Sequence, residues 1–338
     1  MTLHFGRGRG PGHINRSPQG GNVPSLVLNF LSGTLDPRVT FTRTNATSTR
    51  VNASGALELV GANTPRFDYD PNTLALKGLL IEETRTNLFL NSLLNGTNLS
   101  TQNVTVSATP YTISFYGTGS ITLSGAATAT ITGTGAYPTR TTYTFTPTAG
   151  TLTCTVSGTV QYANCEAGSF ATSFIPTAGS TVVRSPDTAT MTGANFTSWY
   201  NQSQGTLLAN FTFAVAQPNF STLPRFIGAA DSAGLTPSSG TAITGYQRVG
   251  GTTQMQIALG SSQIGTQKAA MTYGAKDNVA LNGAKGSSVS GSTAGSMTSF
   301  ILGIGTNFFH NATGQVWYRG ITYYPQSSSD AQLQALTS

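Results

Sequence analysis

The sequence predicts an all-β protein. An extended N-terminal arm and a small anchoring module precede two antiparallel β-sandwiches of the jelly-roll type, and a short helix ends the chain. Three observations predict this class. Only 8% of the 338 residues are charged, against about 25% in an average soluble protein, and glycine contributes 39 residues. Short stretches alternate apolar residues with threonine or serine, and small-residue turns separate them. Helical enzymes and coiled coils need more Glu, Lys, Ala and Leu.

Residues 1–25 are predicted to form an extended basic arm. Their Gly-Arg-Gly-Arg-Gly-Pro-Gly run offers too little apolar surface to offset the entropy lost on ordering. Residues 1–50 hold six arginines and one acid, a net charge of +5 out of the chain's +6. The basic pI therefore belongs to this N-terminal segment, which argues against nucleic-acid binding by the folded body. The arm itself could contact phosphates, remain free or, as we favour, dock on an acidic groove of a neighbouring protein.

Residues 26–92 are predicted to form the anchoring module. Val39–Arg43 alternates like a strand, and Asn52–Gly55 has turn composition. In a chain so short of charge, a dense charged cluster indicates a salt-bridge network or an interface. The cluster consists of Arg66, Asp68, Asp70, Lys77, Glu82, Glu83 and Arg85.

Residues 93–185 are almost free of charge and predict the first sandwich. The expected strands are 111–116, 120–124, 142–146 and 152–156. Cys154 and Cys165 flank a strand-like run and could face each other across a hairpin. Two buried free thiols are the favoured interpretation, and a disulfide stays open.

Residues 186–338 predict the second sandwich, with longer strands. These are expected at 205–213, 225–228, 255–259, 277–281, 299–303 and 316–324. Ser329–Leu336 has a serine cap and leucines at i, i+3, which predicts a short helix packed on the sandwich. Trp317 shares strand parity with Ile321 and Tyr323, so we expect it in the core.

No run approaches the ~20 apolar residues that a membrane-spanning helix needs. The basic N-terminus is not followed by the apolar stretch of a secretory signal. We therefore expect no membrane insertion, and folding in the compartment of synthesis.

Three stretches resemble a module common in structural proteins of tailed bacteriophages: Leu35–Arg43, Thr64–Pro71 and Gly78–Leu88. In that family the module precedes carbohydrate-binding-like sandwiches. Residues 93–185, which end in Phe170–Pro176, are similar to carbohydrate-binding modules. The strand ending Ile321–Pro325 with its helix, and the hairpin Val279–Gly283, are similar to the concanavalin A-like (laminin G-like) jelly roll.

The resemblance implies a virion appendage, a tail or head fibre assembled in the host cytoplasm. Its partners would be other virion proteins, host surface polysaccharide and further copies of the chain, for example in a trimer. Anchoring to the particle is assigned to charged residues of the arm and module: Arg7, Arg9, Arg16, Arg66, Asp68, Asp70 and Arg85.

The acids do not form a catalytic pattern. A glycosidase needs two carboxylates about 5–10 Å apart. Asp68 and Asp70, and likewise Glu82 and Glu83, lie beside an arginine, so ion pairing explains them more simply. The three histidines, His4, His13 and His310, are scattered. The sequence therefore predicts no catalytic residue, no metal site and no cofactor.

Sugar binding has better candidates. A pyranose stacks its C–H face on an exposed aromatic ring, and amides or arginines bind its hydroxyls. The residues that fit are Trp199, Tyr200 and Asn201, Tyr246 with Arg248, and Phe308 with Phe309. Each aromatic residue could instead pack in the core.

The favoured function is adhesion to host glycan, in which weak sites gain about 10²–10⁴ in avidity through copy number. The alternative is a capsid decoration or fibre protein that stabilises the shell. A polysaccharide depolymerase would need the carboxylate pair that the sequence lacks.

Overall fold

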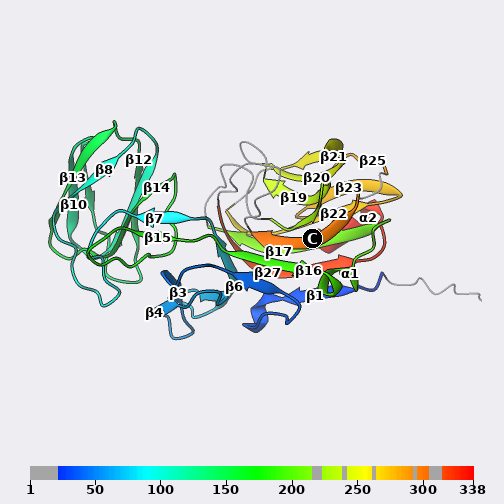
Figure 1. Ribbon diagram of the computed structural model, residues 1–338, viewed down its shortest axis with the longest axis horizontal. Helices are drawn as coiled ribbons and strands as arrows, with labels where there is room; N and C mark the ends of the chain where they lie inside the picture. Colours follow the sequence, from blue (N-terminus) through cyan, green and yellow to red (C-terminus); the bar gives the residue numbers. More distant parts are fainter. Residues whose placement is uncertain (1–21, 215–222, 238–241, 261–263, 292–294, 304–313) are drawn as a thin grey trace, which may run out of the picture.

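The computed structural model describes residues 22–214, 223–237, 242–260, 264–291, 295–303 and 314–338. Within these ranges the chain forms a large and a small β-sandwich joined by a narrow ribbon (Figure 1). The predicted all-β class is confirmed. The C-terminal helix is also confirmed: α2, Asp330–Thr337, begins with a capping box between Ser329 and Gln332. No helix in these ranges is long and apolar enough to cross a membrane.

The large sandwich packs a nine-stranded sheet against a seven-stranded sheet in the described residues. The first sheet runs β24 (Ala284–Lys285), β23 (Lys276–Leu281), β22 (Gly265–Tyr273), β17 (Gly205–Phe213), β27 (Gln315–Tyr324), β6 (Leu76–Glu82) and β5 (Arg66–Tyr69), with β1 (Leu26–Asn29) beside β27 and β25 (Val289–Ser290) beside β23. The second runs β2 (Thr40–Thr42), β16 (Thr188–Thr192), β26 (Met297–Gly303), β18 (Arg225–Gly228), β19 (Ser232–Pro237), β20 (Ile243–Val249) and β21 (Thr252–Leu259). Aromatic and aliphatic side chains of both sheets, among them Phe211, Phe226 and Phe300, fill the core between them.

Most of the strands between residues 26 and 82 belong to this large sandwich. Strand β1 pairs with β27, β2 pairs with β16, and β6 pairs with the other half of β27. The structure therefore differs from the separate module expected at 26–92: both ends of the described chain build one sandwich, and the small sandwich is inserted between β6 and β16. Local alternation predicts strands but does not state which distant strand is the partner.

The small sandwich packs a four-stranded sheet against a three-stranded one. The sheets are β11 (Ala129–Thr132), β10 (Ser120–Gly125), β13 (Gly150–Ser157) and β8 (Gln102–Val106), and β12 (Thr141–Phe145), β9 (Tyr111–Tyr116) and β14 (Gln161–Ala167). Cys154 and Cys165 are buried and free in its core, as the favoured interpretation expected. The hairpin expected between them is wrong, because β13 and β14 belong to opposite sheets.

Two chain crossings connect the sandwiches. Strand β7 (Arg85–Asn87) leads into the small sandwich and β15 (Val182–Arg184) leads back, and the two pair as an antiparallel ribbon (Figure 1). The hairpin of β3 (Ser48–Val51) and β4 (Leu57–Val60) lies beside this ribbon. Two single turns, the 3-10 helix η1 (Phe30–Ser32) and α1 (Ala194–Thr197), complete the fold.

A β-bulge in β27 changes which side chains face the core. Asn210 is opposite Gly320, but the next residue, Phe211, is opposite Tyr318, so Arg319 is the extra residue. Tyr318 therefore points into the core with Ile321, and Trp317 turns to the outer face of the sheet. The expectation that Trp317 shares a face with Ile321 is wrong for this reason.

Candidate functional site

A buried ion-pair cluster fixes the base of the ribbon. It consists of Arg43, Arg66, Glu82, Arg184 and Asp187, and the side chains of all five are fully buried. Glu82 lies 2.6 Å from Arg66 and 3.0 Å from Arg184, and Asp187 lies 3.1 Å from Arg43 and also pairs with Arg66. The predicted salt-bridge network is confirmed here, and Asp187, Arg43 and Arg184 join it from outside the sequence cluster.

Glu82 also binds the small sandwich. It accepts hydrogen bonds from the backbone N–H and the hydroxyl of Ser173, at 2.7 and 2.6 Å. Burial disfavours the charged form of Glu82, but the guanidinium groups of Arg184 and Arg66 and the Ser173 donors outweigh it, so the pKa of this carboxyl lies well below its usual range. Glu82 is therefore an ionised structural anchor between the sandwiches.

The other members of the sequence cluster have separate partners. Glu83 pairs with Arg85 at 2.5 Å, Asp68 pairs with Lys77 at 3.0 Å, and Asp70 accepts backbone N–H groups of the turn that follows β5. Arg66 and Arg85 are buried, so they cannot anchor the chain to another protein. That assignment is corrected, and Asp68, also buried, is corrected with them. Arg7, Arg9 and Arg16 lie outside the described residues.

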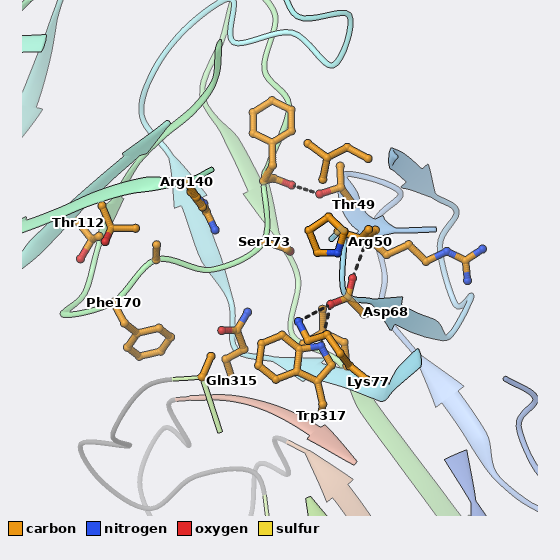
Figure 2. A pocket seen from close by; sticks show the side chains of 18 of the residues that line it. Thr49, Arg50, Asp68, Lys77, Thr112, Arg140, Phe170, Ser173, Gln315 and Trp317 are labelled. Carbon is orange, nitrogen blue, oxygen red and sulfur yellow. Dashed lines mark hydrogen bonds and ion pairs between the residues drawn. The ribbon is translucent and has the colours of Figure 1, made fainter. Parts of the chain in front are cut away.

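A cleft of about 370 Å³ lies between the two sandwiches (Figure 2). Small-molecule sites have volumes of about 300–1,000 Å³ and often lie between domains. The large sandwich contributes β5, β6, β27 and the β3–β4 hairpin, and the small one contributes β9, β12 and residues 169–174. We call this space the interdomain cleft.

Trp317, Lys77 and Asp68 form the large-sandwich wall. The Lys77 ammonium nitrogen lies 3.5 Å from the centroid of the Trp317 ring. Asp68 accepts hydrogen bonds from the Trp317 indole N–H at 2.8 Å and from Lys77 at 3.0 Å. Its other oxygen accepts the backbone N–H of Val51 at 2.8 Å. Figure 2 shows the three side chains together at the edge of the cleft.

Arg140 and a set of threonines form the small-sandwich wall. Arg140 donates to the Thr172 carbonyl and to the Ser114 hydroxyl, both at 2.7 Å, and its guanidinium carbon lies 6.0 Å from the centroid of the Tyr116 ring. Thr112, Thr142 and Thr144 line the cleft on the adjoining strands. Phe170, whose ring is covered by Arg85, closes this wall near Gln315 (Figure 2).

The first predicted sugar-binding group is part of the core. Trp199 is 4% exposed and packs edge-on against Tyr323 and Phe300. Tyr200 stacks on Phe196. The Asn201 amide donates to the Pro325 carbonyl at 2.8 Å, which fixes the chain there. These aromatic faces are covered by protein, so this candidate is wrong.

The remaining sequence candidates do not reach the interdomain cleft. Tyr246 on β20 is 9% exposed, and Arg248 donates to the carbonyl of Gly251 in the adjoining turn. Phe308 and Phe309 lie outside the described residues, as do all three histidines. Across the described ranges, His, Cys, Asp and Glu do not gather in a group of three that could hold a metal ion.

Sequence reasoning missed the residues that line the interdomain cleft. Trp317 was assigned to the core because the bulge at Arg319 has no strong local signal. Lys77 was recognised only as a member of the charged cluster and Asp68 was assigned to anchoring, while Arg140 stands alone between Thr139 and Thr141 in the sequence. An isolated arginine in an otherwise uncharged, Thr-rich strand region is the one signal that could have pointed to the cleft.

No protein-family model and no curated protein matches the chain. Solved structures do match, at low similarity. The CBM40 domain of the Ruminococcus gnavus IT-sialidase, bound to α2,6-sialyllactose, has 13% identity and a TM-score of 0.35 over 43% of this chain and 88% of that one.

Two further matches are of the same order. For botulinum neurotoxin type C, whose cell entry depends on interaction with two ganglioside molecules, the identity is 9% and the TM-score 0.35, over 45% of this chain and 39% of the neurotoxin chain. For the heptameric SAP-like pentraxin of Limulus polyphemus, the identity is 10% and the TM-score 0.32, over 40% of this chain and 70% of the pentraxin chain. Each of these matches is a distant likeness in structure, and similarity at this level transfers no ligand to this chain.

Proposed function

We propose that the protein binds a saccharide in the interdomain cleft. The observation that carries the proposal is the composition of the cleft, which brings aromatic residues, hydroxyl groups and charged donors together in a volume of about 370 Å³. Trp317 contributes the edge of a largely buried ring, 5% exposed, with Lys77 over its face. Saccharides offer apolar C–H faces and many hydroxyl groups, so their sites combine aromatic surfaces with fixed polar groups.

The rigid joint supports this proposal. Ser173 is bound to Glu82, Thr49 donates to the Phe174 carbonyl at 2.6 Å, and Tyr137 donates to the Gly55 carbonyl at 2.5 Å. These contacts hold both walls of the cleft at a fixed separation. A preformed site binds with a smaller loss of conformational entropy.

We propose binding without catalysis. Of the described residues that line the cleft, Asp68 is the only acid, and it already accepts three hydrogen bonds. All eleven carboxylates of the chain accept hydrogen bonds or ion pairs from within the fold. This arrangement supports no paired general acid and base of the kind that a glycosidase uses.

A blocking variant tests the proposal. Thr142 is exposed and lines the cleft on β12, so Thr142→Trp fills space there with little loss of folded contacts. Thr155→Trp is the matched control, because Thr155 is an exposed threonine on β13, on the far side of the small sandwich (Figure 1). On a glycan array we expect the control to bind as the wild type does and Thr142→Trp to lose binding. Equal binding by both variants, or no binding by the wild type, would refute the proposal.

As the biological setting we propose a phage virion, in which the chain is an appendage that binds host surface glycan. The resemblance of residues 35–43, 64–71 and 78–88 to a phage structural module supports this setting. Immunogold labelling of particles with antibody against residues 190–338 tests it. Gold on tail fibres is the expected result; gold over the head would favour the decoration role, and unlabelled particles would exclude a virion component.

A further inference from the structure

The interdomain cleft carries one positive charge that no acid of the fold neutralises. Among the described residues, four charged side chains line it: Arg50, Asp68, Lys77 and Arg140. Arg50 pairs with Glu58 at 2.5 Å, and Lys77 pairs with Asp68 at 3.0 Å. Among the ion pairs of the described residues none involves Arg140.

Arg140 is also held ready for a ligand. A guanidinium has five N–H donors in a planar fork. Two of them bind Thr172 and Ser114, and Nε is buried without a partner among the described residues. Tyr116 lies against the same group, so its orientation is fixed from two sides. Figure 2 shows the guanidinium end pointing from the small-sandwich wall into the cleft.

We propose, on the basis of the saccharide-binding function above, that the ligand is a carboxylate-bearing sugar and that its carboxylate binds Arg140. The fork of a guanidinium matches the two oxygens of a carboxylate. A single free positive charge neutralises one singly charged group, whereas a doubly charged phosphate monoester would leave a partly buried charge without compensation. Hydroxyl groups of the same sugar then meet the threonines of β9 and β12.

The first test changes the ligand and leaves the protein intact. Calorimetric titration of the full chain compares trigalacturonate with its methyl ester, and 3′-sialyllactose with lactose. The two pairs distinguish a hexuronic acid from a nonulosonic acid as the source of the carboxylate. In one pair we expect the neutral compound to bind at least about tenfold more weakly, because it cannot form the charged hydrogen bonds to Arg140. Equal affinity within both pairs would overturn the inference.

The second test changes the protein. Arg140→Gln removes the charge, Arg140→Lys keeps the charge but loses the fork, and Arg248→Gln is the matched control outside the cleft. We expect acid binding to fall about tenfold or more in Arg140→Gln, less in Arg140→Lys, and not in the control. Undiminished acid binding by Arg140→Gln would overturn the inference.

The outcome separates the two proposals. If neutral saccharides bind the wild type and Thr142→Trp abolishes this binding, the proposed function stands. The inference that the ligand carries a carboxylate is then refuted. A wild type that binds no saccharide on the array would refute both.

Discussion

The ammonium nitrogen of Lys77 lies 3.5 Å from the centroid of the Trp317 ring, on the outer face of the large sandwich. Two bulges produce this contact. One in β27, at Arg319, turns Trp317 outward, and one between β5 and β6 interrupts the pairing at Lys77. Bulges are frequent beside functional sites because they redirect a side chain. The two bulges therefore place the Trp317 ring and the Lys77 ammonium group in the cleft. Regular strand alternation would have turned these side chains elsewhere.

Trp317 should report ligand binding by fluorescence. The chain has two tryptophans, and only Trp317 lines the cleft, while Trp199 lies in the core. We expect a binding saccharide to change the emission of Trp199→Phe much as it changes that of the wild type, and to leave Trp317→Phe unchanged. A ligand response that survives in Trp317→Phe would place the site away from this residue.

Loss of the Glu82 charge should destabilise the joint. Glu82→Gln leaves Arg66 and Arg184 buried with fewer partners, and removing one partner from a buried ion pair costs about 3–5 kcal/mol. Urea unfolding at pH 7 measures this cost. Glu58→Gln is the control, because Glu58 forms a partly exposed pair with Arg50. This substitution should lower the free energy of unfolding by less than about 1 kcal/mol. Equal costs for the two variants would contradict the assigned role of Glu82.

The stability difference between the wild type and Glu82→Gln should also depend on pH. The folded-state pKa of Glu82 is lowered, so its contribution to stability is complete above the unfolded-state pKa of about 4.3 and is lost as the pH falls toward the folded-state value. We expect the difference in unfolding free energy between wild type and Glu82→Gln to shrink steadily below about pH 4. Chemical denaturation at several pH values measures it. A difference that stays constant down to acid pH would contradict an ionised Glu82.

Gly78 is required by a close approach in β6. Its φ is 126°, and a Cβ added there would lie 2.0 Å from the Tyr318 carbonyl oxygen. Gly78→Ala should therefore cost well over about 1 kcal/mol. Gly150→Ala is the control, since Gly150 also has a positive φ of 142° but open space around the added atom. Thermal unfolding compares the two, and a Gly150 effect as large as that of Gly78 would mean that the backbone angle alone matters.

The two thiols should react only after unfolding. Burial raises the pKa of the Cys154 thiol to about 12 and raises that of Cys165 well above its ordinary value. Since the thiolate is the reactive form, the native protein should resist a disulfide reagent at pH 8 and consume two equivalents in denaturant. Fast reaction of the native protein would show that the small sandwich opens.

The strands were predictable from sequence, but their partners were not. Alternation placed the strands at 111–116 and 205–213 where the structure has them, because one buried face imposes a period of two. The pairing of β1 with β27 joins residues almost 300 positions apart, and no local pattern encodes it. The charge cluster indicated a salt-bridge network correctly, since charges this rare seldom stay unpaired. The cleft was missed because it forms only when two separate sandwiches meet.

A crystal structure of the full chain with a bound saccharide tests the central claim most directly. Crystals soaked with 3′-sialyllactose or trigalacturonate should show the sugar between Trp317 and Arg140, with its carboxylate on the Arg140 guanidinium. A sugar bound at Tyr246 and Arg248 or on another face, with the interdomain cleft empty, would contradict the account.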